Sequence, residues 1–191
     1  MGIRDRGELV KKKFITDWLS CNPSQRIYEN SDVYPNEEDC PKDHYNMWIP
    51  FECEGKEYTE NKEGLDFILD HIKILCGNDA GVYDVVIKWN AQNIQYPHIK
   101  NGVMPVLISE EGAGKGSYVK LLTRMMGNKK VFETTKPSRD VWGSHNGMME
   151  SAYFVILNEL TKRETMEAEG VIKGLITDPN IDINHKGINQ Y

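Results

Sequence analysis

The sequence "LISEEGAGKGSYVKLL", residues 107–122, joins an apolar run to a helix-like pattern through two acidic residues, three glycines and a lysine. Such a loop can place converging backbone N–H groups on an anion at the start of a helix, where the helix dipole favours negative charge. Lys115 has the length to reach the β- and γ-phosphates of a nucleotide. The residues predicted to bind the nucleotide are Gly112, Ala113, Gly114, Lys115, Gly116 and Ser117.

The loop departs in two places from the common pattern G-x-x-x-x-G-K-[ST]. Ser109 stands where the first glycine is expected, and Gly116 stands where the hydroxyl residue is expected. Because adenylate-kinase-like loops also run Gly-Lys-Gly-Thr, we expect Ser117 to supply the hydroxyl near Mg²⁺. Residues 103–109 are predicted to form the buried strand before the loop, with a helix that opens at residue 117 and stops at Gly127. The alternative is a glycine-rich turn that carries an incidental lysine.

A second apolar run, residues 152–157, ends in Asn158 and Glu159. A buried strand with this ending is where a nucleotide hydrolase holds Mg²⁺ and activates water. Glu159 is the predicted general base, and Asn158 would order a metal-bound water without adding charge. The predicted metal site is Ser117, Asn158 and Glu159, and the predicted catalytic pair is Lys115 and Glu159. The alternative is a core strand that ends at a solvated glutamate.

The last eleven residues, "IDINHKGINQY", alternate on both sides of "HKG" and predict a hairpin. His185 and Lys186 at its tip could contact a nucleic-acid phosphate, although an exposed polar turn explains the same residues. The remaining histidines have no ligand spacing and are interpreted as structural or surface residues; they are His44, His71, His98 and His145.

The rest of the chain divides by pattern. Residues 1–20 predict a short amphipathic helix with Val10, Phe14 and Trp18 on one face. Residues 21–63, rich in turn formers, predict loops with short strands. Residues 64–93 predict two helices, the first ended by Gly77 and the second capped by Asp79. After a linker near residue 96, strands and helices alternate, with a helix over 163–177, which indicates an α/β layered domain.

Composition limits the possible classes of protein. The chain has 191 residues, 39% hydrophobic and 27% charged, which describes a globular protein. It has neither an apolar run long enough to span a bilayer nor a secretory signal. The four widely spaced cysteines predict reduced thiols and a cytoplasmic location. Because the net charge is −6, any contact with DNA must come from a local basic patch.

Taken together, the motifs resemble the superfamily 3 helicase module of poxvirus, giant-virus and phage primase–helicases. The resemblance runs from about residue 44 to the end and is most specific over residues 105–191, in "PVLISEEGAGKGS", "VWGSHNGMM", "FVILNEL" and "LITDPNIDINHKG". It implies a P-loop, AAA+-like three-layer core in a ring, a homo-hexamer, that uses ATP and Mg²⁺ to move on single-stranded DNA and unwind duplex. The family's DNA-gripping hairpin corresponds to His185 and Lys186.

The resemblance also implies three regions and a truncated core. They are an irregular segment over 1–63, a small helical domain over 64–96 and the ATPase core over 97–191. The family continues with a sensor strand, which lies between the loop strand and the acidic strand, and with an arginine finger. We therefore expect this chain to be a fragment, a truncated gene product or one piece of a split protein, which alone binds ATP weakly and does not unwind DNA. The expected partners are a primase domain or the remaining helicase segment, in host cytoplasm or a viral replication site.

Two other classes remain open. The order Gly-Lys-Gly-Ser also fits a nucleoside or nucleotide kinase. Such kinases place the loop near the N-terminus and add an arginine-rich lid, whereas here the loop follows about a hundred residues and is followed by only Arg124, Arg139 and Arg163. A non-catalytic DNA-binding or assembly remnant is favoured by the expected truncation and by Asn158.

Overall fold

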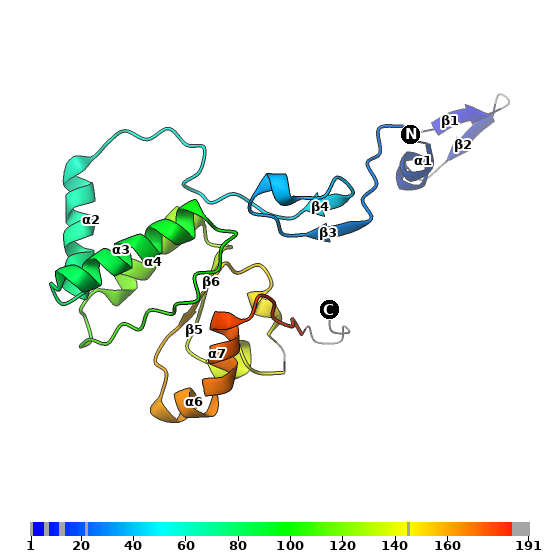
Figure 1. The fold of residues 1–191 in the computed structure, drawn as a ribbon. Helices are drawn as coiled ribbons and strands as arrows, with labels where there is room; N and C mark the ends of the chain where they lie inside the picture. Colours follow the sequence, from blue (N-terminus) through cyan, green and yellow to red (C-terminus); the bar gives the residue numbers. More distant parts are fainter. Residues whose placement is uncertain (1, 6–7, 12–13, 22, 145, 185–191) are drawn as a thin grey trace. The chain divides into compact units, whose positions relative to one another are not determined.

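The computed structural model describes residues 2–5, 8–11, 14–21, 23–144 and 146–184. The chain divides into two compact units, residues 1–48 and 49–191. Helices and strands are mixed throughout, and the described strands form three small sheets of two strands each (Figure 1). The fold class is therefore α/β in the broad sense that the sequence pattern predicted.

The first unit has two small sheets. β1 (Gly2–Asp5) pairs antiparallel with β2 (Glu8–Lys11), and α1 (Phe14–Cys21) follows. β3 (Asn30–Asp32) pairs in parallel with β4 (His44–Asn46), with the 3-10 turn η1 (Glu37–Asp39) between them. The loop and short-strand prediction for 21–63 is confirmed here. The short helix predicted within 1–20 is confirmed as α1, but Val10 does not belong to it, because Glu8–Lys11 pairs with Gly2–Asp5 as a strand.

In the second unit, α2 (Lys62–Leu75) and α3 (Ala80–Gln95) form the two predicted helices. Gly77 follows α2 with a φ of +66°, a left-handed conformation that glycine adopts without strain. The Asp79 side chain accepts a hydrogen bond from the Val82 N–H, as the predicted cap requires. The helical spacing of Val82 and Val85 predicts a buried face on α3, but this is wrong in part, since they are 48% and 61% exposed.

α4 (Lys115–Met126) starts two residues earlier than predicted and carries much of the core. Tyr118, Leu122 and Met126 recur every four residues and are all buried, so one stripe of the helix faces inward. The helix ends at Gly127, as predicted. Its last carbonyls, of Met125 and Met126, accept hydrogen bonds from the N–H groups of residues 53 and 52, which satisfies groups that a helix end leaves unpaired.

β5 (Val131–Thr134) and β6 (Phe154–Leu157) are parallel, with Val131 opposite Phe154. Between them lie α5 (Pro137–Asp140) and the 3-10 turn η2 (Gly147–Met149). The predicted helix over 163–177 is two helices, α6 (Lys162–Glu167) and α7 (Glu169–Thr177), which meet at the buried Ala168. A capping box formed by Thr161 and Glu164 starts α6, because each residue bonds to the other's backbone N–H.

The strand predicted over residues 103–109 is wrong, because these residues lie in no strand. An extended segment becomes a strand only when a neighbour accepts its backbone hydrogen bonds, and among the described residues β6 pairs with β5 alone. The apolar side chains of residues 103–109 are correspondingly exposed to solvent: Val106 is 67% exposed and Ile108 is 91% exposed.

Within the described part of the chain, every helix is too short or too polar to cross a lipid bilayer.

Candidate functional site

The glycine-rich loop leads directly into α4. Gly112 and Gly114 have φ values of +81° and +93°, so both hold the left-handed backbone that glycine permits. Gly114 is the residue before the helix, and its carbonyl accepts hydrogen bonds from the N–H groups of Ser117 and Tyr118. Residues 109–113 are exposed, so a solute can reach the loop.

The backbone donors of the loop remain available. Among the described residues, no hydrogen bond is made by the N–H groups of residues 112–116. The first N–H groups of a helix have no intrahelical partner, and they carry the positive end of its dipole. This end of α4 can therefore bind an anion such as a phosphate group.

Lys115 is folded back over the loop. Its Nζ donates to the carbonyl of Ser109 at 3.0 Å, to the Ser109 hydroxyl at 2.6 Å and to the carbonyl of Glu110 at 3.1 Å. All three acceptors are exposed and neutral. A phosphate oxygen would be a stronger partner, because its negative charge adds the attraction between opposite charges to the hydrogen bond. Ser109, which departs from the expected glycine, thus contributes both of its oxygens to the lysine.

The helices behind the loop are joined by polar contacts in the core. The Tyr118 hydroxyl donates to the Asn90 side chain on α3 at 2.7 Å. The Tyr153 hydroxyl, just before β6, donates to the Asn93 carbonyl of the same helix at 2.8 Å. Burial raises the pKa of Tyr153 to about 12, so this phenol stays a hydrogen-bond donor at neutral pH. α3 therefore connects the loop helix to the strand that carries the predicted acidic residues.

The end of β6 places Asn158 beside a carboxylate from β5. The Asn158 amide donates to Glu133 Oε1 at 2.5 Å, and the Asn158 N–H donates to the Thr134 carbonyl at 2.9 Å. Glu133 thus supplies a negative charge where the sequence has a neutral amide. Sequence reasoning missed it, although the carboxyl ends of neighbouring parallel strands meet at one edge. Glu159 is exposed and has a φ of +56°, which is uncommon outside glycine and is frequent at functional sites.

The structure does not join the two halves of the predicted site. No hydrogen bond or ion pair among the described residues links Glu159 or Asn158 to the loop, and no described cluster of three acidic, histidine or cysteine residues could hold a metal ion. Ser117 lies in the first turn of α4 with an exposed side chain, so its hydroxyl is accessible to a cation. His185 and Lys186 lie outside the described residues, so the hairpin prediction is not tested.

Two residues near the site were missed because their partners are distant in sequence. His71 of α2 contacts the Gly114 carbonyl through Nε2 at 3.1 Å. Asn146 is buried and binds the backbone on both sides of residue 183, donating to the Asp182 carbonyl at 2.9 Å and accepting from the Asn184 N–H at 2.7 Å. Asn146 lies in the segment that belonged to the family pattern without an assigned role, and it fixes the residues that precede His185.

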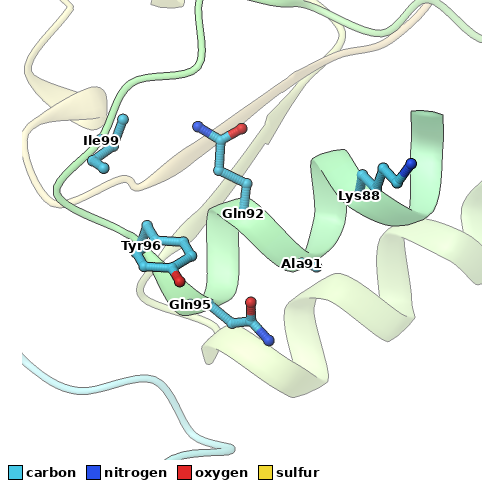
Figure 2. Close-up of a pocket in the computed structure, with 6 residues that line it drawn as sticks. All are labelled: Lys88, Ala91, Gln92, Gln95, Tyr96 and Ile99. Atoms are coloured by element: carbon cyan, nitrogen blue, oxygen red, sulfur yellow. The ribbon is translucent and has the colours of Figure 1, made fainter. Parts of the chain in front are cut away.

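One open surface hollow of about 410 Å³ lies at the C-terminal end of α3. Figure 2 shows its lining residues, which are Lys88, Ala91, Gln92, Gln95, Tyr96 and Ile99. None of them belongs to the glycine-rich loop or to the end of β6. The hollow is therefore separate from the candidate site.

A family model and solved structures are similar to this chain. A family model described as a family of unknown function (DUF5906) matches residues 107–191, which begin at the loop. No protein of curated function matches the chain. Two solved structures of the NrS-1 C-terminal region are similar: the apo structure of residues 305–718 has a TM-score of 0.68 and 21% identity over 86% of this chain. The A-form apo structure has a TM-score of 0.66 and 21% identity over 92% of this chain.

The chain spans 40% and 43% of these two solved chains, less than half of either. The likeness at 21% identity establishes the shared fold.

Proposed function

We propose that the chain is a nucleoside-triphosphate-binding module of an ATP-dependent DNA helicase in viral or phage replication. The observation that carries the proposal is the start of α4. There the N–H groups of residues 112–116 lack acceptors within the described residues, and Lys115 extends over the loop. NrS-1 is a phage primase–helicase, and the similarity of fold to its C-terminal region supports a role in replication.

In this proposal the loop binds the phosphates of ATP. Phosphate oxygens would take Lys115 from its neutral partners, and the backbone N–H groups of the loop would stabilise charge that develops during phosphoryl transfer. The Ser117 hydroxyl, Asn158 and Glu133 would hold Mg²⁺, which would supply positive charge to offset that of the phosphates. Glu159 would accept the proton of the attacking water. Translocation would follow from contacts of His185 and Lys186 with single-stranded DNA in a hexameric ring.

A second candidate is nucleotide binding without hydrolysis, in a remnant that serves assembly or DNA binding. One observation favours it. The Asn158 amide is engaged by Glu133, and Glu159 makes no contact with the loop among the described residues. In that case the loop would bind ATP while the predicted base remains distant from it.

The test is ATP binding and ATP turnover with and without single-stranded DNA. The variants are Lys115→Ala, Glu159→Gln and Lys120→Ala, the last being a matched control on the exposed side of α4. The helicase proposal expects Lys115→Ala to weaken binding about tenfold or more and Glu159→Gln to spare binding but remove DNA-stimulated turnover. Binding without turnover in the wild type would support the remnant. Transfer of phosphate to a nucleoside monophosphate would support a kinase instead.

A further inference from the structure

His71 lies against the phosphate-binding loop although it is 43 residues away in the sequence. It comes from α2, where its neighbour Ile72 is buried at 5% exposure and anchors the helix. The His71 Nε2 atom is 3.1 Å from the Gly114 carbonyl oxygen. Because a carbonyl oxygen only accepts, Nε2 carries the proton and donates this hydrogen bond.

The loop is shaped to receive this ring. Gly114 has a φ of +93°, and a Cβ atom at this position would collide with the His71 imidazole. Two features therefore require glycine at position 114: its left-handed backbone conformation and the space that the His71 ring occupies. No other glycine of the loop has a neighbour within 4 Å of the corresponding position. Among the glycines of the loop, it is thus the one directly before Lys115 whose substitution would displace the His71 ring.

The contact acts on the peptide group that joins Gly114 to Lys115. In a trans peptide, the carbonyl oxygen of one residue and the N–H of the next point in opposite directions. His71, Ser117 and Tyr118 all donate to the Gly114 oxygen. Fixing that oxygen on the helix side directs the Lys115 N–H away from the helix, toward the space in front of its N-terminus where an anion binds.

We propose that His71 is a positioning residue for the phosphate-binding loop. Its Nε2–H holds the Gly114–Lys115 peptide in the orientation that presents the Lys115 N–H to a phosphate, and it thereby connects α2 to nucleotide binding. The inference rests on the proposed nucleotide-binding function of residues 109–117. His71 acts through the backbone of Gly114 and is not itself a phosphate ligand.

A matched pair of amide substitutions tests this role. The amide nitrogen in His71→Gln can reach the place of Nε2, whereas the amide in His71→Asn is one carbon shorter and cannot. His71→Leu removes the donor and keeps a side chain of similar size. The measurement is the Kd of a fluorescent ATP analogue for the 191-residue chain, with far-UV circular dichroism to check that each variant is folded.

We expect His71→Asn and His71→Leu to raise the Kd about fivefold, as the loss of one neutral hydrogen bond implies, and His71→Gln to stay within about twofold of wild type. If His71→Leu does not fold, the comparison between His71→Gln and His71→Asn is sufficient to test the positioning role. Equal Kd values for Gln, Asn and wild type would overturn the positioning role, as would equal weakening by Gln and Asn. If the wild type does not bind the analogue, or binds it unchanged after Lys115→Ala, the proposed function itself fails.

Discussion

Residues 103–108 and β6 are both short apolar stretches that the sequence predicts as buried strands, yet only β6 forms one. β6 bonds to β5 along its length, and Phe154 packs against Trp89 with ring centroids 5.3 Å apart. In residues 103–108, the Val103 carbonyl accepts a hydrogen bond from the same Trp89, but the side chains beyond it are exposed. Trp89 therefore contacts both segments, and the side chains that follow Val103 do not pack against the core. The comparison shows that apolar composition makes a strand possible and that a partner makes it form.

The first prediction tests β6, where a large loss of stability is expected. Phe154→Ala should lower the free energy of unfolding by about 2 kcal/mol, because it removes the ring contacts with Trp89 and Tyr153 and leaves a partly filled space. The measurement is urea unfolding followed by circular dichroism. Val155→Ala in the same strand is the control. Val155 is 36% exposed, so its loss should be less than about 1 kcal/mol. Equal losses for the two variants would mean that β6 does not face the core as described.

The second prediction tests the polar anchor of β5. Thr134 is buried, and its hydroxyl donates to Asp140 Oδ2 at 2.6 Å while accepting from the Lys136 N–H at 2.9 Å. Thr134→Val should cost about 1–2 kcal/mol, since it leaves a part-buried N–H and a carboxylate without this partner. The neighbouring Thr135 is exposed, so Thr135→Val is a matched control that should change stability by less than about 0.5 kcal/mol.

The third prediction concerns the stability of the protein at acidic pH. Hydrogen bonds from Arg139 and then Thr134 hold the pKa of Asp140 below its ordinary value. A carboxyl with a lowered folded-state pKa stabilises the protein above its unfolded-state pKa, and that contribution is lost as the pH falls through the folded-state pKa. Asp140→Asn should therefore be less stable than wild type at neutral pH and show a flatter loss of stability into acid.

Its effect should be smaller than that of Thr134→Val, because an asparagine can still accept from the threonine hydroxyl. Thermal unfolding across the acidic range measures it, with Asp66→Asn on the exposed side of α2 as the control. Parallel pH curves for Asp140→Asn and wild type would contradict the assignment.

The sequence could predict features of this fold that depend on local signals, and it missed features that depend on pairing with distant residues. Local signals succeeded: the cap at Asp79, the helix stop at Gly127, and the start of a helix directly after the glycine-rich loop. Each depends on residues a few positions apart, where backbone preferences decide the outcome. The hairpin of β1 and β2 was missed because its pairing depends on register, which periodicity alone does not report.

The candidate site divides in the same way. Lys115 and its partners in residues 109–110 lie within six positions of one another, so the motif could predict the loop. His71 and Glu133 could not be assigned, because their roles depend on which elements pack together. A histidine in the middle of an amphipathic helix has no distinguishing pattern in sequence. Only the contact with Gly114 separates it from the other histidines.

The smallest expected effect returns to residues 103–108. Ile108 is 91% exposed, so Ile108→Ala should change the free energy of unfolding by less than about 0.5 kcal/mol, despite removing a large apolar side chain. Leu122→Ala on α4 is the positive control. Leu122 is 4% exposed, and its truncation should cost about 2–4 kcal/mol in the same urea titration. A loss above about 1 kcal/mol for Ile108→Ala would show that this segment packs in solution, since an exposed side chain has no contacts to lose. The difference between the two segments would then lie in hydrogen bonding alone.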